Sequence, residues 1–212
     1  MLFRHIIGTM LLLALFAVVG TGLVALTHAG TQERIAANER EALLKSIHAL
    51  IPPSSHDNDI FTDTVAVIDP LLGNDEPHTA YRARSGAQAV AVVLTPIAPD
   101  GYNGTIKLLV AINHDSTLAG VRILSHRETP GLGDGIEVER SDWVLGFNSR
   151  SLSDPAIKQW GVKKDGGAFD QFTGATITPR AVVNAVKQSL LYFRDHRDTL
   201  FALPQQETTD NG

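Results

Sequence analysis

The residues best placed to do chemistry lie in a short segment that precedes the last predicted helix. This segment, residues 170–176, reads Asp-Gln-Phe-Thr-Gly-Ala-Thr, and Thr178-Pro179 then form a helix start signal with threonine at the N-cap. Amide groups at a helix N-terminus attract anions, and the small residues Gly174 and Ala175 let a bulky group approach the backbone. The pattern alone has two interpretations: threonines that only cap the helix, or a hydroxyl beside a phosphate site.

A second candidate segment is rich in glycine and follows the predicted strands. Its residues are Glu128, Thr129, Pro130, Gly131, Leu132 and Gly133. The glycine spacing matches neither the phosphate-binding P-loop nor the dinucleotide-binding fingerprint. By itself, the segment is typical of a tight turn. His126 stands two residues before the glutamate.

Taken together, the two segments resemble the FMN-binding domain of two families of membrane redox proteins. These are the RnfG/RsxG component of Rnf/Rsx electron transport complexes and the C component of Na⁺-translocating NADH:quinone reductases. The resemblance extends from the N-terminal apolar segment to about Phe193 and is closest to the Rnf/Rsx type, including Val162–Arg180. The motif residues at the family spacing are Asp170, Thr173, Gly174, Ala175 and Thr176.

The resemblance implies one FMN, bound covalently through a phosphoester to Thr176 by a flavin transferase that uses FAD. Asp170 would belong to the motif that the transferase recognises. In the glycine-rich segment, the implied cofactor-binding residues are Glu128, Thr129, Gly131, Leu132 and Gly133. We expect this segment close to the flavin ring, with Leu132 packed on an apolar face.

Three further side chains near these motifs have alternative interpretations. Lys163 and Lys164 either neutralise the phosphate or belong to a solvated surface. His126 either donates a hydrogen bond to the flavin ring or ends a strand. The other histidines do not have metal-ligand spacing, so we predict no metal site. The resemblance implies an electron relay with no catalytic residue of its own.

The function implied by the resemblance is an electron-relay subunit of an ion-translocating Rnf/Rsx-type complex. Such a complex links ferredoxin and NAD or reduces a redox-sensing transcription factor. The protein would count as an enzyme only as a component of the oxidoreductase (translocase), and its partners would be the other subunits, the flavin transferase and the lipid bilayer. The alternatives are the C component of the quinone reductase, a flavin-free membrane-anchored assembly or sensory module, and an extracytoplasmic solute-binding protein.

Composition excludes several other classes. The chain has 212 residues and no cysteine, so disulfides, thiolate metal sites, iron–sulfur clusters and thiol nucleophiles are excluded. It has 18 Lys plus Arg against 23 Asp plus Glu, a net charge of −5. That balance gives no reason to expect nucleic acid as a partner.

The N-terminus predicts a membrane anchor. Ile6–Leu26 is 21 residues without a charge, which as a helix covers about 31 Å, the thickness of a bilayer core. A cleaved signal peptide is the alternative, but its apolar core is shorter, and Thr27-His28-Ala29 is a poor cleavage site. Because positive charge tends to stay in the cytoplasm, Arg4 predicts that the bulk of the chain lies outside the cytoplasm. With the resemblance, this implies a single-pass inner-membrane protein whose soluble domain is periplasmic.

Periodicity predicts an α+β fold, with a central, mainly antiparallel sheet flanked by helices. Three apolar runs, at residues 89–94, 105–113 and 118–124, predict an antiparallel meander covered on part of both faces. An amphipathic helix over 31–50 continues from the membrane, and residues 52–78 read as loop with a short strand at 64–68.

We therefore predict four parts of the chain. A cytoplasmic stub with the anchor is followed by a juxtamembrane helix and loop, one FMN-binding domain and a C-terminal tail. Their boundaries are 1–29, 30–78, 79–200 and 201–212.

Overall fold

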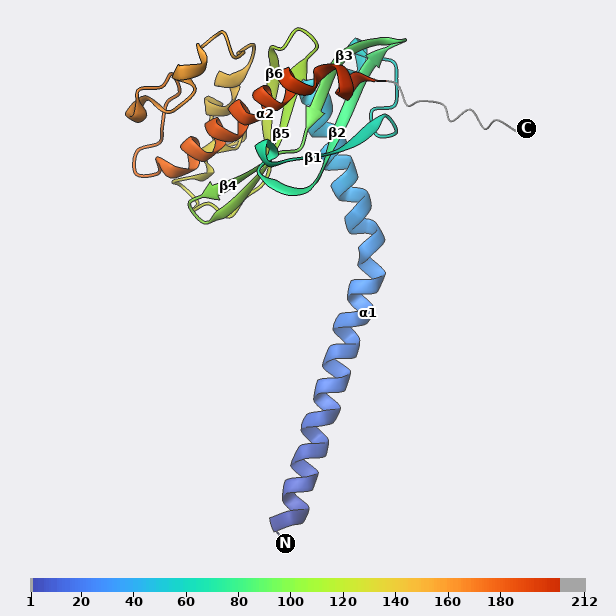
Figure 1. Ribbon diagram of the computed structural model, residues 1–212. Coiled ribbons are helices and arrows are strands. Elements are labelled where there is room, and N and C mark those ends of the chain that lie inside the picture. The colour runs from blue at the N-terminus through green and yellow to red at the C-terminus, as the bar shows by residue number, and fades with distance from the viewer. Residues whose placement is uncertain (1, 203–212) are drawn as a thin grey trace, which may run out of the picture. The chain divides into compact units, whose positions relative to one another are not determined.

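The chain begins with a single long helix. The computed structural model describes residues 2–202 and divides after Lys45 into an N-terminal unit and a second unit that starts at Ser46 (Figure 1). Helix α1, Leu2–Leu50, has 49 residues, so the predicted anchor and the predicted amphipathic helix are one continuous element. By length and composition, this helix can cross a membrane. Of the predicted tail, 201–212, residue 201 still belongs to a helix, and residues 203–212 lie outside the described part of the chain.

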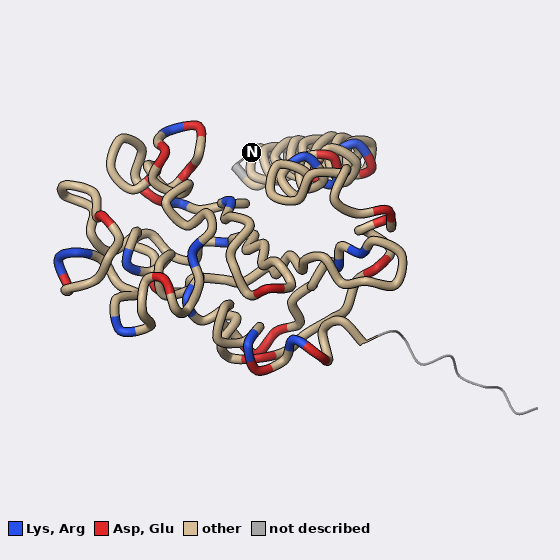
Figure 2. The backbone as a smooth tube through the Cα atoms, turned by 90° about the horizontal axis from the view of Figure 1, so that it is seen from above, with Lys and Arg blue, Asp and Glu red and all other residues tan. Residues whose placement is uncertain are grey.

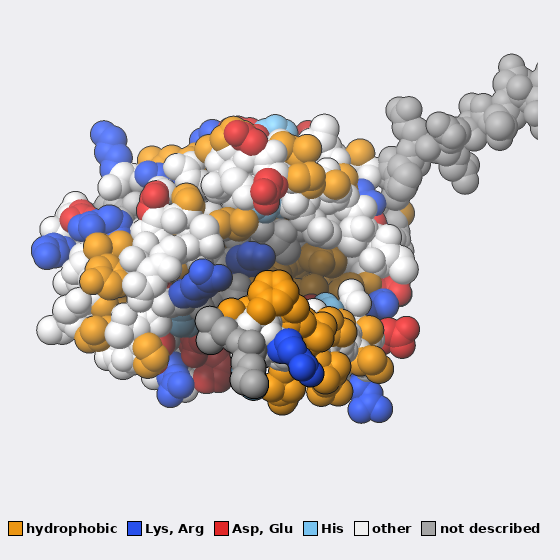
Figure 3. All heavy atoms as spheres, turned by 90° about the horizontal axis from the view of Figure 1, so that it is seen from below, with side chains coloured by type: hydrophobic (Ala, Val, Ile, Leu, Met, Phe, Trp, Pro, Cys, Tyr) orange, Lys and Arg blue, Asp and Glu red, His pale blue; other side chains and the backbone are white. Residues whose placement is uncertain are grey.

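The anchor part of α1 has the surface that a membrane helix needs. Its large apolar side chains, among them Leu12, Phe16 and Val24, are exposed within the N-terminal unit. In Figure 3, hydrophobic side chains are gathered on this helix. Such a surface is favourable in lipid and costly in water, because apolar area left in water loses the stabilisation of burial.

The second unit is built on a six-stranded sheet in the described residues, and every strand pair in it is antiparallel. The strands are β1 Thr64–Asp69, β2 Asn74–Ser85, β3 Gln88–Leu94, β4 Ile97–Gly101, β5 Gly104–Asn113 and β6 Leu118–Ser125. β5 pairs with β6 along one edge. Along its other edge, the first half of β5 pairs with β4 and the second half with β3.

Two parts of this sheet differ from the sequence prediction. The expected loop at 52–78 contains β1, whose span agrees with the predicted strand at 64–68, and also the start of β2. Acidic residues and Pro77 hide the start of β2 in the sequence. β4 was not expected, because it contains Pro99-Asp100, a turn signal; the strand tolerates the proline where its register with β5 is interrupted.

Both faces of the middle of the sheet are buried, as predicted. Leu108, Val110 and Ile112 of β5 lie in the main apolar cluster with helix α2, Ile177–Phe201. Leu109 and Ala111 point to the opposite face and are also fully buried. α2 lies across the sheet and packs against β4 and β5 (Figure 1).

The N-terminus of α2 differs from the prediction in one respect. The helix starts at Ile177, so the N-cap is Thr176 and not Thr178. Pro179 is still tolerated in the first turn, because amide groups there have no partner within the helix. The Thr178 hydroxyl, freed from capping, donates a hydrogen bond to Glu128.

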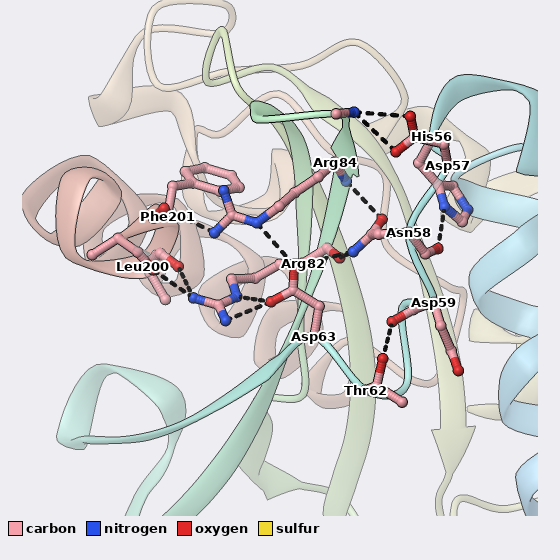
Figure 4. A network of polar contacts seen from close by, with 12 residues as sticks. His56, Asp57, Asn58, Asp59, Thr62, Asp63, Arg82, Arg84, Leu200 and Phe201 are labelled. Carbon is pink, nitrogen blue, oxygen red and sulfur yellow. Dashed lines mark hydrogen bonds and ion pairs between the residues drawn. The ribbon is translucent and has the colours of Figure 1, made fainter. Parts of the chain in front are cut away.

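The C-terminus of α2 is held by a network of charged groups (Figure 4). Arg82 Nε and Arg84 Nε donate to the two carboxylate oxygens of Asp63, at 2.6 and 2.8 Å. The same guanidinium groups donate to the carbonyls of Ala202 and Phe201, each at 2.8 Å. Because helix C-termini carry negative partial charge, these carbonyls help one carboxylate to balance two buried arginines.

Asp63→Asn is expected to lower the free energy of unfolding by about 3–5 kcal/mol, because it leaves two buried guanidinium groups without their carboxylate. The measurement is chemical denaturation of the detergent-solubilised protein. Asp198→Asn is the matched control, since Asp198 is 97% exposed and its loss should change the free energy by less than about 0.5 kcal/mol. Equal denaturation midpoints for the two variants would contradict the structural role of Asp63.

Candidate functional site

The two sequence motifs meet at one pocket of about 350 Å³, here called the Thr176 pocket. Three parts of the fold contribute to its wall: the turn between β4 and β5, the loop after β6, and the start of α2. The lining residues are Tyr102, Glu128, Thr129, Leu132, Gly133, Gly174, Ala175, Thr176, Ile177 and Thr178.

A tight turn delivers Thr176 to this pocket. The Ala175 amide donates to the Phe172 carbonyl at 3.1 Å, and Gly174 has a φ of +81°. Glycine adopts that conformation without strain, whereas a residue with a side chain rarely does. The chain then enters α2 directly, which places the half-buried Thr176 at the helix N-terminus.

Neither threonine at the helix start acts as a side-chain cap. Within residues 2–202, the Thr176 hydroxyl makes no capping hydrogen bond, and the Thr178 hydroxyl is directed to Glu128. The interpretation that these threonines only cap the helix is therefore wrong for this structure. The Thr176 hydroxyl is left available on the wall of the pocket.

Aromatic packing supports the turn from behind. Trp143 Nε1 donates to the Asp170 carbonyl at 2.7 Å, and the Trp143 and Phe172 rings lie edge to face with centroids 5.4 Å apart. Phe172 in turn packs on Gly135, where a Cβ atom would come within 3.0 Å of the ring. The start of the motif is thereby anchored to the segment that joins it to the glycine-rich loop.

Glu128 joins the three parts of the wall. Its side chain is only 5% exposed; Oε1 accepts from the Asn103 amide at 3.0 Å, and Oε2 accepts from the Thr178 hydroxyl. Gly133 lies directly against this contact, because a Cβ atom there would be 2.9 Å from both Glu128 Oε2 and Thr178 Oγ1. A side chain at position 133 would push the loop away from the helix.

His126 stabilises the same loop. Its Nδ1 accepts from the Glu128 amide at 3.0 Å, and its Nε2 lies 2.8 Å from Glu137 Oε1. Because a backbone amide can only donate, Nδ1 must be unprotonated, so Nε2 carries the proton and donates to Glu137. Both ring nitrogens are thus engaged within the loop, which favours the structural interpretation of this histidine.

The other predicted residues lie at different places around the pocket. Thr129 Oγ1 accepts from Asn103 Nδ2 at 3.1 Å, and Leu132, 48% exposed, stands at the mouth. The remaining three predicted residues are exposed and do not line the pocket in the described structure: Asp170, Thr173 and Gly131. Lys163 Nζ is paired with Asp170 Oδ1 at 2.6 Å.

Sequence reasoning missed two residues of the pocket mouth. Tyr102 is 65% exposed at the turn between β4 and β5, and Ile177 is also exposed. With Leu132 they surround the mouth with large apolar side chains, which is typical of a binding site. Tyr102 follows Pro99-Asp100-Gly101, and a single aromatic residue after such a turn signal carries no local sign of function.

Charged groups are dispersed over the second unit. Figure 2 shows acidic and basic residues interspersed along its backbone.

Comparison with known proteins identifies the family. Residues 101–191 match the family model of the FMN-binding domain, and residues 1–50 match that of the RnfG N-terminal region. Proteins named as the G component of the ion-translocating oxidoreductase complex are similar over nearly the whole chain. The one from Pseudomonas aeruginosa (strain UCBPP-PA14) is 52% identical over 94% of both chains.

Relatives from other bacteria agree. The Shewanella loihica protein is 49% identical over 95% of both chains, and that of Vibrio cholerae is 50% identical over 92% of this chain and 93% of its own. The FMN-binding domain confirms the expectation from the motifs, and the α+β fold and the apolar N-terminal helix confirm those from periodicity and hydropathy. This chain therefore belongs to the RnfG family, the G components of ion-translocating oxidoreductase complexes.

Proposed function

We propose that this protein relays electrons through one FMN that is esterified to Thr176. The observation that carries the proposal is the state of the Thr176 hydroxyl: half-buried, not used as a helix cap in the described structure, and on the wall of a pocket with an apolar mouth. The chain itself holds the cofactor and exposes it to redox partners. The oxidoreductase activity belongs to the assembled complex.

The residues present fit FMN. A phosphate on Thr176 would stand at the N-terminus of α2, where the helix presents amide groups and positive partial charge. Leu132 and Tyr102 offer apolar surface for a flat ring, and Gly174, where a Cβ atom would lie 3.8 Å from Leu132, keeps a side chain out of its approach. When bound, FMN supplies the electron-transfer chemistry, and the protein supplies placement and electronic tuning.

Attachment needs a donor that the cell supplies. In the proposed reaction with FAD, a bond forms between Thr176 Oγ and the phosphorus of the FMN half. The pyrophosphate P–O bond breaks, AMP leaves, and the threonine proton passes to the transferase or to water. The reaction involves no oxidation or reduction. The exposed Asp170 and Thr173 are accessible to a transferase that reads the motif.

We place the second unit in the periplasm. The apolar helix α1 can serve as the anchor, and Arg4 before it favours a cytoplasmic N-terminus. A flavin outside the cytoplasm is not replenished from the cytoplasmic pool, so a covalent bond prevents its loss. The proposed partners are the other subunits of an Rnf/Rsx-type complex in the inner membrane, which links ferredoxin and NAD or reduces a redox-sensing regulator.

The attachment site is tested by comparing two threonines of one turn. Thr176→Ala, expressed with the flavin transferase, should abolish the ultraviolet fluorescence of the denatured polypeptide on a gel. Thr173→Ala removes a motif residue but not the proposed acceptor, so it should lower the fluorescence without abolishing it. The matched control is Thr199→Ala, which changes an exposed threonine near the end of α2 and should leave the fluorescence unchanged. A fluorescent Thr176→Ala protein, or a flavin mass on another residue, would refute the assignment.

The role of Glu128 is tested by removing its acceptor atoms. Glu128→Ala should destabilise the protein by about 1–3 kcal/mol, because it leaves the buried Thr178 hydroxyl unpaired, whereas the backbone amide of the exposed Asn103 can bind water instead. Glu128→Gln should cost less, because its amide can accept from Asn103 and donate to the rotatable Thr178 hydroxyl. Thermal unfolding of the unflavinylated protein measures both. Similar melting temperatures for both variants would contradict the anchor role.

The topology is tested with reporter fusions after Gly212. A reporter that is active only in the periplasm should be active there, because Arg4 keeps the N-terminus in the cytoplasm and one helix crosses the membrane. Activity of a cytoplasm-only reporter at the same position would reverse the proposed orientation.

A further inference from the structure

We infer that Arg180 binds the phosphodiester on Thr176, and that Asp165 holds this arginine while the threonine is unmodified. The inference rests on the proposed flavin attachment and adds a partner exchange within the chain. Arg180 would be a positioning residue for the cofactor. When it leaves Asp165 for the phosphodiester, the segment Lys163–Asp165 would be released.

The existing ion pair has the geometry that a phosphate can replace. Arg180 Nε and Nη2 donate to Asp165 Oδ2 and Oδ1, at 2.6 and 2.9 Å. This two-point fork suits carboxylate and phosphate oxygens equally well. The side chains of Arg180 and Asp165 are 47% and 43% exposed, so no burial locks them together.

The position of Arg180 on α2 brings it to the modified group. It follows Thr176 by four residues, and its amide donates to the Thr176 carbonyl at 3.2 Å, so the two residues are separated by one helical turn. Side chains four residues apart lie on the same face, and the later one points back toward the helix N-terminus. The guanidinium can therefore reach a phosphate on Thr176.

Charge at the helix start explains why Arg180 needs an anion. A cation in the first turn opposes the helix dipole, so an unpaired arginine there is unfavourable. The hydrogen bonds between the two groups lower the pKa of Asp165 and raise that of Arg180, so both stay ionised. A phosphodiester would bring a second anion to the same end of the helix and compete with Asp165.

The predicted phosphate cations are less suitably placed. Lys163 is paired with Asp170, at the opposite end of the motif from α2. Arg180, in contrast, lines a cavity of about 540 Å³ that shares Ile177 with the Thr176 pocket. Arg180 therefore lies beside the acceptor on the helix side.

The change of partner by Arg180 should be detectable in the short 3₁₀ helix that carries Asp165. Its turn is closed by two hydrogen bonds: the backbone amides of Asp165 and Gly167 donate to the Val162 carbonyl, at 2.9 and 3.0 Å. Release of Asp165 removes the ion pair that joins this turn to Arg180 of α2. The amides should then exchange with solvent faster, although no atom of the turn is chemically modified.

The test compares the full chain with and without the flavin, made with and without the transferase. Hydrogen exchange at the amides of Asp165 and Gly167 should rise about two- to fivefold on flavinylation, the effect expected for loss of one exposed ion pair. The ³¹P resonance of the flavinylated protein should shift in Arg180→Gln. Arg194→Gln is the control, because Arg194 pairs with Asp195 on the same helix, away from its start.

The variants distinguish the change of partner by Arg180 from other effects of flavinylation. In unmodified Arg180→Gln and Asp165→Asn, hydrogen exchange at the Asp165 and Gly167 amides should already be fast. Flavinylation of Arg180→Gln should not increase it further. If flavinylation leaves hydrogen exchange unchanged in the wild type, or raises it equally in Arg180→Gln, the inference about Arg180 is overturned. The proposed attachment of the flavin to Thr176 is not affected by that result. Mass spectrometry of the Thr176 peptide reports separately on attachment, and an unmodified threonine would overturn both proposals.

Discussion

The Glu128 carboxylate stabilises the place where the turn between β4 and β5, the glycine-rich loop and helix α2 meet. A buried carboxylate is costly unless its oxygens are hydrogen-bonded. Here one oxygen accepts from the Asn103 amide and the other from the Thr178 hydroxyl, so the cost is offset only when all three segments are in place. These three segments are also the ones that line the Thr176 pocket.

Both ends of α2 are held by charged side chains of opposite sign. Glu128 contacts the first turn through Thr178, and Arg82 and Arg84 donate to carbonyls at or beyond the last turn. These contacts agree with the helix dipole, which favours anions at the N-terminus and cations at the C-terminus. Arg180 is the exception, since it is a cation in the first turn. Its pairing with Asp165 makes that position tolerable.

The accuracy of the sequence predictions depended on the range of the interactions involved. The apolar runs of β3, β5 and β6 and the periodicity of α2 are local patterns, and these elements were predicted. β4 and β2 were not among the predicted strands: Pro99 and Pro77 are turn signals, and only pairing with neighbouring strands makes these segments extended. Thr178 was predicted as the N-cap, since nothing near it in sequence indicates that a distant carboxylate takes its hydroxyl.

The sequence by itself determined the class of molecule: an apolar helix long enough to cross a membrane, an α+β FMN-binding domain, and no cysteine chemistry. Only the tertiary structure decided which residues surround the threonine. Tyr102 and Leu132 come together across the pocket mouth, and Asp165 holds Arg180, because strand pairing and one buried carboxylate bring distant segments into contact. Local patterns follow from neighbouring residues, whereas a pocket wall depends on contacts between segments that the folded chain alone brings together.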